Sequence, residues 1–99
     1  MIKTGGVNVY PAEIEEVLRG NSKVKAVAVV GVPDEHWGEK VIACVVASAP
    51  ISEEELLNYC TEKLAGFKKP KSVVFLDTLP TDKTGKILKR QLREKLSMK

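Results

Sequence analysis

The sequence has few residues of the kinds that build metal sites, disulfides or membrane anchors. Its 99 residues include two cysteines and one histidine, and Cys44 and Cys60 lie in apolar surroundings without Cys-x-x-Cys spacing. We expect two reduced core thiols, no metal site and no disulfide. No apolar run approaches the roughly 20 residues that span a bilayer, and Met1-Ile2-Lys3 lacks the apolar stretch of a secretory signal. These absences predict a soluble, cytoplasmic domain without an integral membrane segment.

Complete catalytic motifs are also absent. A Walker A phosphate loop needs a glycine five residues before its Gly-Lys pair and a Ser or Thr after it, but Pro80 and Ile87 occupy these places around Gly85-Lys86. The chain has no Ser/His/Asp order, no carboxylate pair with a base between its members, and no glycine-rich nucleotide cradle. If the domain takes part in chemistry, it contributes a cation to a site that is built elsewhere.

Positive charge is concentrated in the last third of the chain. Residues 1–62 carry five Lys or Arg against ten Asp or Glu, whereas residues 63–99 carry eleven against three. Such a segment attracts anions, so its plausible partners are nucleotide phosphates, nucleic acid or an acidic protein surface. A solvated basic helix explains the same composition.

Apolar periodicity predicts one α+β domain, because 99 residues are too few for two cores. Helices are expected over residues 11–19, over residues 52–65 and over residues 86–96. The runs "VKAVAVVGV" and "KVIACVVAS" are continuously apolar, which indicates neighbouring strands covered on both faces.

A third strand is expected at "KSVVFLD", and Gly5-Gly6 should turn a small N-terminal hairpin. The predicted architecture is therefore a sheet of about three strands backed by three helices and preceded by that hairpin.

Three segments, in order along the chain, resemble the C-terminal domain of acyl-CoA synthetases. They are "GGVNVYPAEIEEVL", "VVGVPDEHWGEKVIACVV" and "LAGFKKPKSVVFLDTLPTDKTGKILKRQLRE", and together they cover most of the sequence. The adenylate-forming superfamily to which these enzymes belong also contains firefly luciferase and the adenylation domains of peptide synthetases. The resemblance implies that residues 1–99 form a mobile lid, and that a large N-terminal domain with the ATP-binding loop and the acyl pocket is absent from this chain.

The activity implied by the resemblance is an AMP-forming acid–thiol ligase. A carboxylate attacks the α-phosphate of Mg-ATP to give an acyl-adenylate and pyrophosphate, and the thiol of coenzyme A then displaces AMP while the lid presents a different face. Lys86 matches the adenylation lysine, since it is the lysine of the closing Gly-Lys motif. ATP, Mg2+ and coenzyme A are cofactors of the full-length enzyme. The isolated chain is expected to bind none of them tightly and to be inactive.

The resemblance also implies a coenzyme A face. Gly5 and Gly6 match a loop against the pantetheine tunnel, and Trp37 matches an aromatic residue on the pantetheine arm. A tight hairpin turn explains the two glycines as well, and a core position explains the tryptophan.

Phe67, Lys69 and Lys71 match positions that stack the adenine of coenzyme A and hold its phosphates. A helix-to-strand loop with Phe67 in the core is the structural alternative. Alternatively, Lys71 could contact the phosphate of AMP instead of coenzyme A. The sequence does not decide which of Lys69 and Lys71 contacts a phosphate.

Other functions stay open at this point. The motif reads Thr-Gly-Lys rather than the Asn-Gly-Lys typical of peptide synthetases, which favours an acyl-CoA ligase over another superfamily branch. A fatty acid is the first candidate substrate, with aryl and short acids as alternatives, because the acyl pocket belongs to the other domain. The expected partners are that domain, a carboxylic acid, ATP and coenzyme A, and not nucleic acid. A basic nucleic-acid-binding module and a non-catalytic oligomerisation domain are the rival readings.

Overall fold

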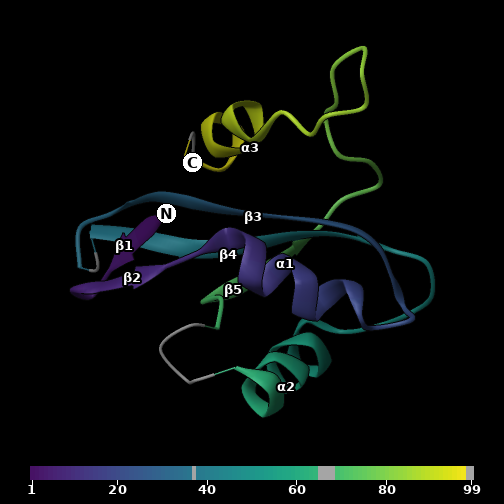
Figure 1. Ribbon diagram of the computed structural model, residues 1–99, viewed down its shortest axis with the longest axis horizontal. Coiled ribbons are helices and arrows are strands. Elements are labelled where there is room, and N and C mark those ends of the chain that lie inside the picture. Colours follow the sequence, from purple (N-terminus) through teal and green to yellow (C-terminus); the bar gives the residue numbers. More distant parts are fainter. Residues whose placement is uncertain (37, 65–68, 98–99) are drawn as a thin grey trace.

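The computed structural model describes residues 1–36, 38–64 and 69–97. A five-stranded mixed sheet forms its centre (Figure 1). The strand β4 (Gly38–Ala47) pairs along one edge with the antiparallel strand β3 (Val24–Asp34). Its other edge is shared by the antiparallel β1 (Ile2–Thr4) and the parallel β5 (Ser72–Phe75). The hairpin partner of β1 is β2 (Val7–Val9).

Three helices cover the two faces of this sheet. The helices α1 (Pro11–Arg19) and α2 (Glu53–Lys63) lie on one face, and α3 (Lys89–Ser97) lies on the other (Figure 1). The α+β class is therefore confirmed. The N-terminal hairpin joins the predicted three strands through β1 and extends the sheet to five.

The chain length predicts a single core, but alternate residues of β3 and β4 pack into two cores, one on each face of the sheet, because successive side chains of a strand point to opposite faces. One core joins strand residues such as Val29 and Ala43 to Ile14 of α1 and Leu56 of α2. The other joins the remaining set to Leu92 of α3: Ala28, Val30, Val32, Ile42 and Cys44. This double coverage is the reason that both strands read as continuous apolar runs.

The helix ends follow local rules. Pro11 is the first residue of α1, as predicted, and Ser52 caps α2 by accepting a hydrogen bond from the Glu55 N–H at 3.1 Å. The third helix begins at Lys89, three residues later than the sequence pattern predicts. The preceding residues are engaged elsewhere: Ile87 bridges to Thr81, so this stretch closes a loop before the helix can start.

Both cysteines are free and buried, as expected of core thiols. Burial raises the pKa of Cys44 to about 11 against the opposing charge of Lys95, and burial also raises the pKa of Cys60. The thiolate, which is the reactive form, is therefore disfavoured at both positions. In the described ranges, no helix has the length and apolar character needed to cross a membrane.

Candidate functional site

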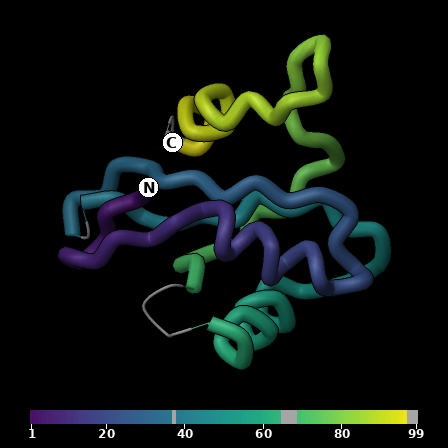
Figure 2. Tube along the Cα trace, viewed as in Figure 1, coloured from purple at the N-terminus to yellow at the C-terminus, as the bar shows by residue number. Residues whose placement is uncertain are grey.

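Lys86 lies in a closed loop between β5 and α3. Thr81 and Ile87 form an isolated antiparallel bridge at its base, and the Leu88 N–H donates to the Pro80 carbonyl at 2.8 Å. Gly85 has a φ of +88°, a left-handed conformation that favours glycine. The loop projects well away from the sheet (Figures 1 and 2). Lys86 is therefore presented on a shaped turn at the periphery of the fold.

The conformation of this loop is fixed by the side chain of Asp82. Its Oδ1 accepts hydrogen bonds from the Thr84 hydroxyl at 2.6 Å, the Thr84 N–H at 2.8 Å and the Lys86 N–H at 3.0 Å. The Asp82 N–H donates in turn to the Lys86 carbonyl at 2.9 Å. These hydrogen bonds, that of the Thr84 hydroxyl first, lower the pKa of Asp82, so the carboxylate stays ionised at neutral pH. Asp82 thus holds the backbone of Lys86 from both sides.

Asp82 was not among the residues singled out from the sequence. The available signal was local: an aspartate two residues before a threonine and three before a glycine is typical of a side-chain-closed turn. The Gly-Lys pair predicts Lys86 but not the carboxylate that shapes its loop.

The Lys86 side chain is exposed. Within the described ranges, no carboxylate forms an ion pair with its ammonium group. An exposed lysine on a loop closed by these contacts can meet an anion supplied from outside the domain.

The predicted coenzyme A residues lie at a different place. Gly5 and Gly6 have φ values of +56° and +80° and form the turn between β1 and β2. No atom lies within 4 Å of the position that a Cβ at Gly6 would occupy. Turn geometry alone thus requires glycine here, and the space beside Gly6 is open.

Lys71 and Lys69 precede β5. The Lys71 N–H donates to the Val41 carbonyl at 2.8 Å, and the Lys69 ammonium lies 3.4 Å from the Thr61 hydroxyl. Since β1 meets β4 at Gly38, the hairpin and Lys71 share one edge of β4 near its first residues. Trp37 and Phe67 lie outside the described residues.

The structure therefore separates the predicted site residues into two groups. Figure 1 shows the hairpin of β1 and β2 at one end of the molecule and the Lys86 loop at the other. In any one orientation of this domain, the two groups therefore face different parts of a partner.

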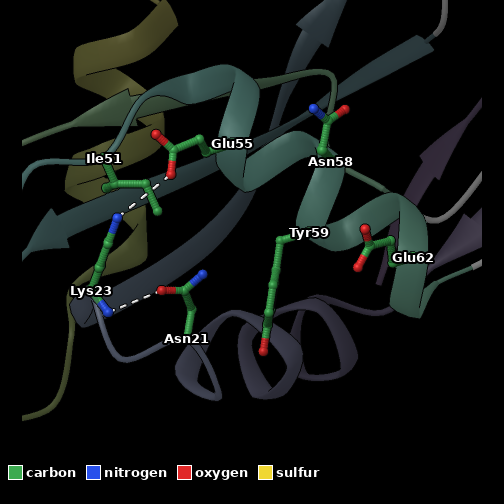
Figure 3. Close-up of a pocket in the computed structure, with 7 residues that line it drawn as sticks. All are labelled: Asn21, Lys23, Ile51, Glu55, Asn58, Tyr59 and Glu62. Atoms are coloured by element: carbon green, nitrogen blue, oxygen red, sulfur yellow. Dashed lines mark hydrogen bonds and ion pairs between the residues drawn. The ribbon is translucent and has the colours of Figure 1, made fainter.

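A shallow pocket of about 320 Å³ lies elsewhere, between α2 and the turn before β3 (Figure 3). Lys23 pairs with Glu55 there at 3.7 Å, and its N–H donates to the Asn21 side chain at 2.9 Å. The remaining lining residues are Ile51, Asn58, Tyr59 and Glu62. None of them belongs to the predicted site.

Over the described ranges, no group of three His, Cys, Asp or Glu side chains could hold a metal ion.

Comparisons with known proteins agree with the three motifs. The family model described as "AMP-binding enzyme C-terminal domain" matches residues 13–86. The long-chain-fatty-acid–CoA ligase FadD13 of Mycobacterium tuberculosis is 52% identical over 98 residues, which are 98% of this chain and 20% of the relative. The chain thus spans about a fifth of the length of this relative.

Two solved structures have the same fold. ATP-bound MatB from Rhodopseudomonas palustris superposes with a TM-score of 0.93 at 43% identity, covering 97% of this chain and 20% of MatB. The o-succinylbenzoate CoA synthetase MenE of Bacillus subtilis, in complex with its acyl-adenylate intermediate, superposes with a TM-score of 0.87 at 41% identity, covering 93% of this chain and 19% of MenE.

Proposed function

The chain belongs to the family of AMP-binding enzyme C-terminal domains, and on this premise we propose that it is the mobile lid of an AMP-forming acid–thiol ligase. Lys86 is the residue that acts in the first half-reaction. The observation that carries this proposal is an exposed ammonium group, unpaired among the described residues, on a loop that Asp82 holds in one shape.

The chemistry follows from the charge that develops on phosphorus. When a carboxylate attacks the α-phosphate of ATP, negative charge builds on the phosphoryl oxygens and passes to pyrophosphate. A lysine ammonium is a compact cation that can bridge the attacking carboxylate and the α-phosphate. In a site from which water is excluded, one such interaction lowers the barrier by about 3 kcal/mol or more. Lys86 would lower the barrier to acyl-adenylate formation in this way.

The separation of the two residue groups supports a lid with two working positions. In the first position the Lys86 loop would close over the nucleotide. In the second, the edge with Gly5, Gly6, Lys69 and Lys71 would face coenzyme A, and Lys86 would be withdrawn. On this proposal, the basic last third of the chain meets nucleotide phosphates rather than nucleic acid.

The rest of the active site is proposed to come from an N-terminal domain. That domain would hold the ATP-binding loop, the acyl pocket and Mg2+, and the proposal is supported by the length of the relative FadD13, of which this chain covers 20%. We propose a fatty acid as the acyl substrate because the 52% identical relative is a long-chain-fatty-acid–CoA ligase. The succinylbenzoate ligase among the neighbours makes aryl acids the necessary comparison in any substrate panel.

The test separates the two half-reactions in the chain joined to its N-terminal domain. Lys86→Ala should slow acid-dependent ATP–pyrophosphate exchange by about 100-fold or more, because it removes a charge that is needed in the transition state. Thioester formation from supplied acyl-adenylate should change by less than about threefold, since Lys86 is then withdrawn. The matched control is Lys83→Ala, which removes another exposed lysine from the same loop.

Equal losses in both half-reactions would contradict the assignment, as would an equal effect of Lys83→Ala. The substrate class is read from the same assay by replacing the fatty acid with aryl and short acids.

A further inference from the structure

The outer edge of β3 carries a buried carboxylate that the mechanism above does not use. Glu15 of α1 is only 7% exposed. Its Oε2 accepts the Val29 N–H at 2.8 Å, and this N–H belongs to the edge strand of the sheet. The same oxygen lies 2.7 Å from the ammonium group of Lys89, while Arg19 lies farther away, at 3.8 Å from Oε1. Lys89 is therefore the main countercharge of Glu15.

This ion pair connects elements that are otherwise in different layers. Glu15 comes from α1 on one face of the sheet, and Lys89 is the first residue of α3 on the other face. One turn further along α3, the Arg93 Nε donates to the Gly31 carbonyl at 2.9 Å, on the same strand. The start of α3 is thus fastened across the open edge of β3 at two places.

Lys89 follows Lys86 by three residues, directly after the base of the loop. The other side of that base is held by the bridge between Thr81 and Ile87 and by packing of Ile87 in the second core. If the first turn of α3 moves relative to β3, the loop before it therefore moves too, together with the ammonium group of Lys86.

We propose that the Glu15–Lys89 pair is a positioning device for Lys86 in adenylation, an inference that rests on the function proposed above. A carboxylate that is almost fully buried must stay paired, which fixes Lys89 more firmly than a solvent-exposed ion pair would. Fixing Lys89 limits the positions that the loop can take. The alignment of Lys86 with the reacting carboxylate and phosphate depends on that restriction.

The experiment compares neutral variants of this pair with a matched exposed pair, in the chain joined to its N-terminal domain. Lys89→Gln removes the countercharge, and Glu15→Gln removes the charge while leaving an oxygen for the Val29 N–H. Each should lower kcat for adenylation about tenfold, because small misplacements of a catalytic group have effects of this order. The KM for the acid and thioester formation from acyl-adenylate should stay within about twofold. The double variant should be no slower than either single one.

The control is Arg90→Gln, which breaks the exposed pair between Arg90 and Glu94 on the same helix. It should leave both half-reactions unchanged. Lys89→Arg should restore most of the adenylation rate, since a longer cation can still meet the carboxylate.

Hydrogen exchange in the same proteins separates positioning from loss of stability. In Lys89→Gln the amides of Gly85, Lys86 and Leu88 should exchange faster, while those of β3 and β4 keep their protection. Faster exchange throughout the sheet, with equal losses in both half-reactions, would overturn the proposal. So would unchanged adenylation in Lys89→Gln when Lys86→Ala is slow, and in that case the proposed function stands. Unchanged adenylation in Lys86→Ala would instead overturn the proposed function and this inference with it.

Discussion

The turn at Gly6 and the loop at Gly85 each contain a glycine with a similar positive φ, but they are held by different contacts. Gly6 has a φ of +80° and Gly85 a φ of +88°, and at both positions no atom lies within 4 Å of an added Cβ. The turn at Gly6 is held by the ladder between β1 and β2. The loop at Gly85 is held by the carboxylate of Asp82 and displays Lys86. A similar φ at one glycine therefore does not distinguish the two turns, whereas their side chains and their locations do.

The largest difference between the turns should appear when Asp82 is removed. Asp82→Ala deletes the acceptor of three hydrogen bonds, two of which come from backbone N–H groups at Thr84 and Lys86. The loop then loses the contacts that fix Lys86, and adenylation should fall by about 30-fold, between the effects of losing and of misplacing the cation. Thioester formation, which we propose to depend on the turn at Gly6, should change little. The two half-reactions, measured separately, give the comparison.

Asp82→Asn provides the control, because its amide oxygen can still accept these hydrogen bonds, and it should recover much of the rate. Loss of the Asp82 charge by protonation should show only at low pH. The hydrogen bonds of Asp82 hold its pKa below the usual 3.8, so they order the loop above that value and lose this effect as the pH falls through the lowered pKa. The Thr84 amide resonance should therefore be constant from neutral pH down to about pH 5 and shift only below about pH 4. A shift near pH 6 would show that the carboxylate does not hold the loop.

The features of the fold that depend on neighbouring residues in the sequence could be predicted. The bounds of α1 follow from Pro11 and the apolar spacing after it, and the pairing of β3 with β4 follows from two apolar runs joined by a short turn. The start of α3 could not be predicted in this way. Ile87 continues the apolar pattern of the helix, but it pairs with Thr81 across the loop, and a contact between two chain segments overrides helical periodicity.

The site shows the same limit. Lys86 could be singled out from its motif, whereas the buried ion pair of Glu15 could not, because Glu13 and Glu15 look alike as acidic residues in the first half of a helix. In the structure Glu13 is exposed and Glu15 is buried against the edge of β3, where it meets Lys89 from the other end of the chain. Only the path of the chain brings these two charges together.

A pair of equal substitutions tests whether the two turns serve different half-reactions. Gly85→Ala and Gly6→Ala each force an alanine into a left-handed conformation, which costs about 1 kcal/mol and should lower stability to the same extent. Gly85→Ala should slow adenylation about fivefold with little effect on thioester formation, and Gly6→Ala should do the reverse, since its Cβ enters the space proposed for pantetheine. Urea unfolding of both variants checks that the stability losses match. Losses of the same half-reaction in both variants would remove the functional distinction between the turns.

The smallest effect is expected from the lysines before β5, which lie on the same edge of β4 as the Gly6 turn. Lys71→Ala should raise the KM for coenzyme A about threefold without changing the KM for ATP, because an exposed lysine contributes one screened phosphate contact. Lys69→Ala is the matched substitution at the other described lysine of this segment. A smaller change at position 69, together with loss of the Lys71 effect in high salt, would assign the phosphate contact to Lys71. If Lys71→Ala raises the KM for ATP instead, Lys71 faces the nucleotide, and this edge of β4 contributes to the first half-reaction as well.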